Sequence, residues 1–368
     1  MRQFTRSLIA GTAMAVAMAG GAVAQEEKVL NVYNWSDYIA EDTIANFEKE
    51  TGIKVNYDVY DSNEMLEAKL LAGNSGYDVI VPTSTFLARF VQGDIVQPLD
   101  KSKIPNWKHL DEDLMKGLQA NDPGNEHAAI YQWGTNGLGV IPEKIDAAMA
   151  GEEAPMNSWD LLFKPEYASK LADCGIYVLD SPSEIFPITM AYLGHPHNTD
   201  DPAHYQEAEE LWMEIRPYIK KFHSSEYINA LANGDACLAM GFSGDVFQAK
   251  FRAEEAGKDF TVGYVIPKEG TAMWFDTLAI PADAPHPENA HTFINYILQP
   301  EVIGGITDYV AYANAVPASE PYVSDEIWND PAIFPTPEVK QKLFVDTPAG
   351  QKLDRLRTRT WNKIKTGR

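Results

Sequence analysis

The sequence predicts an α/β protein built as two lobes with a ligand cleft between them. Three observations lead to this prediction. Strand-like and helix-like segments alternate through roughly the first hundred residues that follow the N-terminal apolar run, which is typical of a largely parallel sheet flanked by helices. The chain of 368 residues is longer than one hydrophobic core usually serves. A strand-like run at 130–140 is broken by three glycines, as expected of a segment that crosses between lobes and flexes there.

Residues 1–24 have the features of a secretory signal peptide. Arg2 and Arg6 give it a positive start, residues 8–23 are apolar and rich in small side chains, and Ala22–Ala24 forms a small-x-small cleavage site. The run is too short to span a bilayer, and no later apolar run is long enough to do so. We therefore expect an exported, soluble protein. No cysteine follows the cleavage site closely, so a lipid anchor is not expected.

Charge and cysteine content narrow the possible partners. The formal net charge is −23, and the signal peptide contributes two arginines and no acids, so the mature chain is more acidic still. Such a protein repels phosphate backbones, so nucleic acid is not an expected partner, whereas a cationic ligand is attracted. Cys174 and Cys237 are the only cysteines, and export brings them into an oxidising compartment. We predict one disulfide, because two such distant cysteines make a poor zinc site.

The elements of the first lobe follow in order from apolar periodicity and from glycine and proline. Gly52 is placed to end the first helix, and Pro82 to stop the third strand. Asp61 and Glu64 have the spacing of a cap for the second helix. The expected elements are strands at 29–33, 53–60 and 77–81, and helices at 39–51, 65–72 and 83–90.

A second α/β region follows the glycine-broken run. Residues 260–266 are strand-like and are predicted to form the return crossing between the lobes. Lobes joined by crossing strands, with no flexible linker, are built from discontinuous stretches of chain. The other expected elements are strands at 176–180 and 237–241, and helices from 158 and at 184–193, 205–217, 287–298, 337–344 and, as a solvated Arg-rich tail, 355–368.

Polar or acidic residues with aromatic neighbours recur at the ends of the predicted strands. The most informative stretch is Trp35–Tyr38, which joins an aromatic face, a hydroxyl, a carboxylate and a phenol. In an open α/β sheet such ends converge on the ligand cleft. Carboxylates that converge without a metal motif are unfavourable unless a cation lies between them, and a diamine with aromatic walls along its methylenes meets both conditions. The pattern recurs at Thr83, Asp180–Glu184, Phe242–Asp245 and Trp274–Asp276.

Signatures of enzyme chemistry are missing from the sequence. It has no His-Glu-x-x-His zinc motif, no Gly-x-Ser-x-Gly nucleophile turn and no phosphate-binding Gly-x-x-x-x-Gly-Lys-[Ser/Thr] loop. The glycines Gly134, Gly137 and Gly139 have the wrong order of spacings for a dinucleotide fingerprint. A pair of glycosidase acids is not marked anywhere, although sequence alone leaves such a pair open. We therefore expect a binding protein and not an enzyme, with no metal and no cofactor.

Several long runs resemble those of periplasmic substrate-binding proteins of bacterial polyamine ABC importers, and most of all the putrescine-binding type. The resemblance extends over Val29 to Gly367. The runs that carry it are Tyr33–Ile39, Asn46–Val55, Gln97–Lys103, Phe222–Ser225, Leu231–Asp235, Ile266–Gly270 and Arg355–Trp361. Together these runs are highly specific.

The resemblance implies the type II periplasmic-binding-protein fold, in which each lobe is a mixed, mainly parallel sheet flanked by helices and the lobes close on ligand by hinge motion. We expect one lobe from 28–134 plus 266–308, and the other from 135–265 plus 309–368. The implied function is capture of a linear polyamine in the periplasm, putrescine favoured over spermidine, and its delivery by a monomer to the membrane permease subunits of an ABC importer. A sensor that signals to a membrane receptor, or an exported hydrolase, remain as alternatives.

The resemblance also implies a ligand set and supports the pairing of Cys174 with Cys237. Asp245 and Asp276 are expected to meet the ammonium groups. Two wall positions depart from the putrescine-binding type, because Phe242 stands where that type has Trp, and Trp274 where it tends to have Phe, so the preferred polyamine stays open. Thr83 replaces a serine hydroxyl. The implied ligand residues are Trp35, Ser36, Asp37, Tyr38, Thr83, Glu184, Phe242, Asp245, Trp274, Asp276 and Tyr312.

Overall fold

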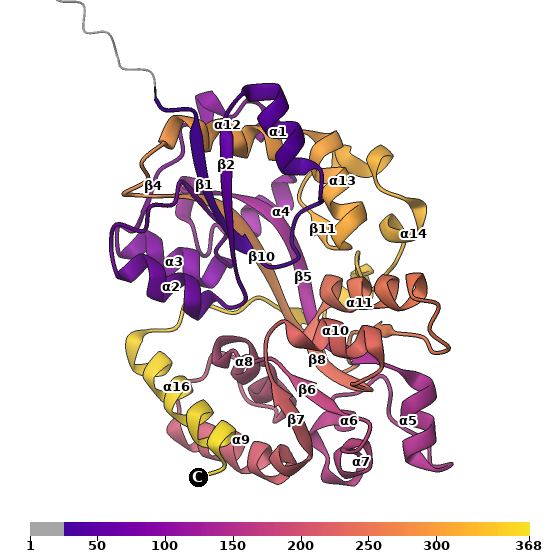
Figure 1. Cartoon of the computed structure of the whole chain (residues 1–368). Coiled ribbons are helices and arrows are strands. Elements are labelled where there is room, and N and C mark those ends of the chain that lie inside the picture. The colour runs from indigo at the N-terminus through magenta and orange to yellow at the C-terminus, as the bar shows by residue number, and fades with distance from the viewer. Residues whose placement is uncertain (1–25) are drawn as a thin grey trace, which may run out of the picture.

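The computed structural model describes residues 26–368, so the predicted signal peptide lies outside the described residues. These residues form two α/β lobes, one above the other in Figure 1, and each lobe has its own buried core. The predicted fold class, an α/β protein of two lobes with mixed sheets, is confirmed, although the pairings made by the two crossing strands are almost all antiparallel. No helix within the described range is long and apolar enough to cross a membrane.

Two long strands, β5 (Ala128–Val140) and β10 (Thr271–Pro281), run from one lobe into the other. They pair antiparallel, with Trp274 opposite Gly134. In the first lobe, β2 (Lys54–Tyr60), β1 (Val29–Trp35) and β3 (Val79–Ile80) continue the sheet in parallel, and β3 joins β10. In the second lobe, β8 (Leu238–Phe242) pairs with β5, and β6 (Ile176–Val178) and β7 (Ile219–Phe222) follow in parallel.

Helices cover the faces of both sheets. The first lobe carries α1 (Thr43–Thr51), α2 (Asn63–Leu71), α3 (Ser84–Gln92), α4 (Glu112–Leu118), α12 (Pro287–Ile297) and α13 (Pro300–Val310). The second carries α5 (Pro142–Met149), α6 (Asp160–Phe163), α7 (Pro165–Leu171), α8 (Pro182–Tyr192), α9 (Pro202–Ile215), α10 (Glu226–Asn233) and α16 (Gln351–Thr366). Helix α11 (Ser243–Glu255) contributes side chains to both cores.

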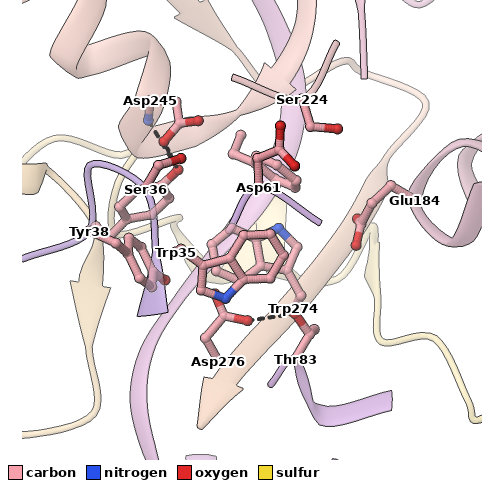
Figure 2. A pocket seen from close by; sticks show the side chains of 12 residues that line it. Trp35, Ser36, Tyr38, Asp61, Thr83, Glu184, Ser224, Asp245, Trp274 and Asp276 are labelled. Atoms are coloured by element: carbon pink, nitrogen blue, oxygen red, sulfur yellow. Dashed lines mark hydrogen bonds between the residues drawn. The ribbon is translucent and has the colours of Figure 1, made fainter. Parts of the chain in front are cut away.

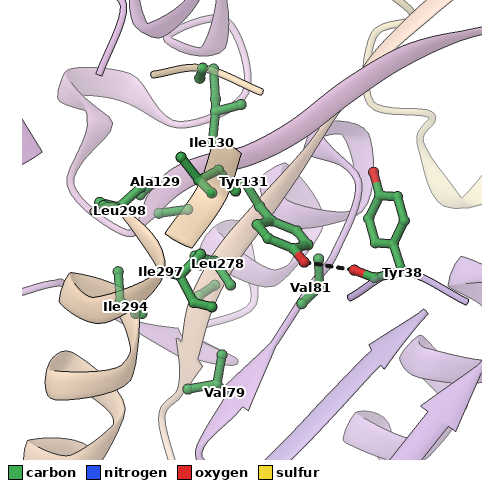
Figure 3. Close-up of a cluster of buried hydrophobic side chains, with 14 of the residues drawn as sticks. Tyr38, Val79, Val81, Ala129, Ile130, Tyr131, Leu278, Ile294, Ile297 and Leu298 are labelled. Atoms are coloured by element: carbon green, nitrogen blue, oxygen red, sulfur yellow. Dashed lines mark hydrogen bonds between the residues drawn. The ribbon is translucent and has the colours of Figure 1, made fainter. Parts of the chain in front are cut away.

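The core of the first lobe holds one wall of the cleft in place. Side chains of β3, β5 and β10 pack against α12, among them Val79, Leu278 and Ile294 (Figure 3). At the edge of this cluster the Tyr131 hydroxyl donates a hydrogen bond of 2.6 Å to the backbone carbonyl of Tyr38. The apolar packing therefore fixes the backbone of the aromatic stretch that follows β1.

The helix caps agree in part with those predicted from the sequence. Gly52 ends α1 in the left-handed conformation, at φ 71°, as predicted. The predicted cap of α2 is wrong, because Ser62 makes the capping bond, accepting from the Met65 amide at 3.3 Å. Asp61 and Glu64 are thereby left available for other contacts.

The return crossing and one helix also differ from prediction. The crossing strand is β10, and the predicted 260–266 strand shrinks to β9 (Gly263–Val265), an edge strand paired with β5. The helix predicted at 337–344 ends at Lys340 as α15 (Pro337–Lys340), and β12 (Leu343–Phe344) pairs with the start of β10. A two-residue strand carries too little local signal to be separated from the helix before it.

The chain after α13 divides between the two cores. Side chains from Val310 to Ile333 pack into the first core, whereas those from Leu353 to Ile364 pack into the second. The sequence prediction had assigned 309–368 wholly to the second lobe. The predicted disulfide between Cys174 and Cys237 is present, with 5.5 Å between the Cα atoms, and it joins the segment that follows α7 to the residue before β8.

Candidate ligand-binding site

A cavity lies between the lobes, at the strand ends that the sequence had marked (Figure 2). Side chains from both lobes and from the crossing strand β10 enclose it. Ten of the eleven predicted ligand residues line it, and Asp37 does not. The lining consists of Trp35, Ser36, Tyr38, Asp61, Thr83, Glu184, Ser224, Phe242, Asp245, Trp274, Asp276 and Tyr312.

The walls of the cavity are aromatic rings that pack against one another. Phe242 meets Trp274 edge to face at 5.8 Å between ring centroids, and meets Trp35 at 6.2 Å. Trp274 continues to Tyr312 at 5.6 Å. The Trp35 indole donates to the carbonyl of Val81 at 2.9 Å, which fixes its ring. Such walls cover methylene groups and present π faces to a cation.

Two glycines make room for these rings. A Cβ on Gly244 would lie 2.3 Å from the Tyr312 ring, and one on Gly134 would lie 2.8 Å from Trp274. Both distances are far below normal contact, so any larger residue would displace a wall of the cavity. Gly134, which the sequence marked only as a flexible point, therefore also has a packing role.

Asp245 is buried in the first turn of α11, where the helix dipole favours a negative charge. Its two carboxylate oxygens accept hydrogen bonds from the hydroxyls of Tyr227, at 2.6 Å, and Tyr312, at 2.7 Å. Burial raises the pKa of Asp245 to about 6, although these two hydroxyls oppose the rise. The tyrosines thus hold the carboxylate in one orientation at the cavity wall.

Asp276 is buried on β10 and faces the same cavity. The Thr83 hydroxyl donates to it at 2.6 Å and itself accepts from the Asn63 amide at 2.9 Å. Burial raises the pKa of Asp276 to about 7, and the nearby Asp245 carboxylate adds to the rise. The hydroxyl predicted at position 83 therefore orients an acid as well as lining the cavity.

Glu184, in the first turn of α8, is a third acid in the cavity. Burial raises its pKa to about 8, and the carboxylates of Glu64 and Asp276 contribute next. No lysine, arginine or histidine lines the cavity. Ionised carboxylates enclosed in this way are unfavourable without a cation between them, so the site is electrostatically suited to a ligand with positive charge at more than one point.

Asp37 lies outside the cavity. It adopts the left-handed conformation, at φ 55°, in the turn after β1, and its carboxylate pairs with Arg252 of α11 at 2.7 Å. Its carbonyl accepts from the Gln248 amide at 2.9 Å. Asp37 therefore ties the Trp35–Tyr38 turn to α11 and does not face the ligand space.

Two lining residues, Asp61 and Ser224, were not predicted. Asp61 directly follows β2, so the rule that found the other strand-end residues would also have found it. Ser224 lies just after β7, in the Phe222–Ser225 run that had supported the family resemblance. Within residues 26–368, no three His, Cys, Asp or Glu side chains are grouped so that they could hold a metal ion.

An acidic, aromatic-walled cavity enclosed by two α/β lobes on crossing strands defines the class of solute-binding proteins. The chain belongs to the bacterial extracellular solute-binding protein family, whose model matches residues 42–336. It is similar over its full length to two relatives, both described as putrescine-binding periplasmic proteins. SpuD of Pseudomonas aeruginosa is 55% identical, with all of both chains covered, and PotF of Escherichia coli is 49% identical, with 100% of this chain and 99% of PotF covered.

Solved structures agree with this family. A putative spermidine/putrescine ABC transporter protein from Listeria monocytogenes superposes with a TM-score of 0.82 at 30% identity, covering 93% of this chain and 100% of that one. PotD from Streptococcus pneumoniae, described as a spermidine/putrescine substrate-binding protein, gives a TM-score of 0.73 at 28% identity, with 92% and 99% covered. These relatives are substrate-binding transport proteins and not enzymes.

Proposed function

We propose that this protein captures a linear polyamine, putrescine favoured and spermidine next, and delivers it to the permease subunits of an ABC importer. The observation that carries the proposal is the group of three acids, the buried Asp245 and Asp276 and the half-buried Glu184, around an aromatic-walled cavity that no protein cation lines. The names of the relatives support the same ligand class. They also support a periplasmic location. We infer that the signal peptide is removed near Ala24 and that the protein works as a monomer.

In this mechanism each ammonium group meets a carboxylate that the protein has already oriented. We assign one end of the ligand to Asp245 and the other to Asp276, with Glu184 nearby and Trp35 and Trp274 along the methylenes. Burial of each charge costs several kcal/mol unless it is paired. Cation–π contacts add about 0.5–2 kcal/mol each, and micromolar affinity requires only about 8 kcal/mol net. The residues present are sufficient for such binding.

Hinge motion about β5 and β10 would open and close the cavity, because these are the strands that run between the lobes. For the lobe boundaries we adopt the two cores, which place Val310–Ile333 with the first lobe and α16 with the second. The glycines of β5 supply backbone freedom at the crossing.

Calorimetric titration of the full mature protein, unfolded and refolded to remove carried-over ligand, tests the proposal. We expect one-to-one binding of putrescine, and the ratio of its affinity to that of spermidine reports on the Phe242 and Trp274 walls. A folded sample that gives no heat with either amine would overturn the polyamine assignment. Uptake of labelled putrescine by cells that lack and then regain the protein distinguishes transport from sensing alone.

A further inference from the structure

A single acid of the first lobe binds the start of a helix in the second lobe. Glu64, on α2, accepts hydrogen bonds from the hydroxyl of Ser183 at 2.9 Å and from that of Ser181 at 3.2 and 3.3 Å. Both serines stand at the N-terminal end of the eleven-residue helix α8, where backbone N–H groups and the helix dipole favour an anion. The contact joins the lobes at the edge of the cavity.

The lobes must approach for this contact to form. Helix α2 is anchored in the first core through Leu66 and Leu70, and α8 in the second core through Ile185 and Phe186. Opening the cleft therefore separates Glu64 from its serine partners. Glu64 does not line the cavity, but Ser183 directly precedes Glu184, which does. Closure thus brings a carboxylate of one lobe to the residue that directly precedes a ligand-facing glutamate of the other.

Two other acids that join the lobes or their edges are paired with a protein cation, whereas Glu64 is not. Asp354 of α16 pairs with Arg89 of α3 at 3.0 Å, and Asp37 pairs with Arg252 at 2.7 Å. Each of those acids meets a protein cation. Among the described residues, Glu64 has hydroxyl partners and no ion pair, and its carboxylate contributes to raising the pKa of Glu184, which lines the cavity.

We propose that Glu64 determines the charge specificity of the site, because it links closure of the lobes to a cationic group beside Glu184. Closure without such a cation would bring two partly desolvated carboxylates together, which is unfavourable. An ammonium group beside Glu184 makes closure favourable, since both carboxylates then attract it. A ligand of the same length with only one charge either leaves these two acids without a cation or places its ammonium group beside them and leaves Asp245 unpaired. This inference rests on the proposed function and deepens it.

The test compares putrescine with 4-amino-1-butanol, which has the same length and one charge fewer, by calorimetry on the refolded mature protein. The Glu64→Gln variant keeps an oxygen that can accept from the serines and removes the charge. We expect the preference for putrescine over the amino alcohol to fall about tenfold in this variant, the equivalent of one pKa unit of charge interaction. Glu50→Gln is the matched control, because Glu50 is an exposed acid of the same lobe away from the cleft, and its ratio should not change.

A second variant separates the charge of Glu64 from its contact. Ser181→Ala with Ser183→Ala removes the hydroxyl donors and keeps the charge, so both ligands should weaken together and their ratio should stay near that of the wild type. Equal weakening of both ligands by Glu64→Gln, or an unchanged ratio, would refute the role in charge specificity. If the wild-type protein binds neither amine, the proposed function itself fails. Thermal melting checks that each variant is folded.

Discussion

Replacing Asp276 by asparagine should weaken putrescine binding strongly while leaving the protein at least as stable. The side chain keeps its shape, and its remaining oxygen can still accept from the Thr83 hydroxyl, now 2.6 Å away. The ammonium group, however, loses its oriented counter-charge in a buried site. Removing one partner of a buried ion pair costs about 3–5 kcal/mol, and relief of the repulsion from Asp245 returns part of it. A net loss of about 2–4 kcal/mol predicts affinity lower by roughly 30- to 1,000-fold.

The same substitution should leave the folded protein as stable or more stable, so a loss of affinity cannot be explained by a loss of folding. Because burial raises the pKa of Asp276 to about 7, its ionised form destabilises the folded protein at pH 8 when no ligand is added. The Asn variant should then melt at or above the wild-type temperature at pH 8. Calorimetry gives the affinity and thermal denaturation gives the stability, with Asp200→Asn, an exposed acid of the second lobe, as the control. An affinity within about threefold of the wild type in a folded variant would refute the assigned role.

Three further predictions follow from the same geometry. Phe242→Trp enlarges a ring that contacts both Trp35 and Trp274, so the ratio of putrescine to spermidine affinity should change; an unchanged ratio in calorimetry means that this wall does not set selectivity. The rise in melting temperature caused by putrescine should be larger at pH 8 than at pH 5.5. The pKa values of Asp276 and Glu184 are raised to about 7 and about 8, so the stability of the ligand-free protein falls as the pH rises through these values, and the diamine restores it. Equal rises at the two pH values would contradict this direction. Cys174→Ser with Cys237→Ser opens a link of sequence separation 63 and should lower the free energy of unfolding in urea by about 4 kcal/mol, and no loss would show that the disulfide is not stabilising.

The sequence predicted the cavity well because its chemistry is concentrated at strand ends. Polar side chains that follow β1, β3 and β8 had to converge once the alternation of strands and helices indicated parallel sheets. The same reasoning placed Asp37 in the cavity, and a local feature explains why it lies outside. Its left-handed backbone, at φ 55°, turns the chain within the Trp35–Tyr38 stretch, and nothing in a run of four polar and aromatic residues says which side chains face inward.

Other errors arose where pairing is not local. The return crossing belongs to β10, whose partner on β5 is about 140 residues away in the sequence, so periodicity could show a buried strand but not which strand crosses. The segment from Val310 to Ile333 stays with α13 in the first core and α16 packs into the second, and only tertiary contacts decide where the chain changes lobes. Ser62 caps α2, since its hydroxyl lies next to the helix start and competes directly with Asp61 and Glu64.

The distribution of charge around the cleft links recognition to closure. Arg89 and Arg252 pair with acids at its edges, so those contacts can form whatever the cavity contains. Among the described residues, Asp245, Asp276 and Glu64 accept side-chain hydrogen bonds from hydroxyls, and none of these three acids or Glu184 forms an ion pair, so no protein cation neutralises them when the lobes meet. A ligand that supplies positive charge at both ends removes this penalty, and one that supplies less removes only part of it. The free energy difference between open and closed lobes should therefore follow the charge of the ligand more closely than its apolar area, since the aromatic walls already pack against one another.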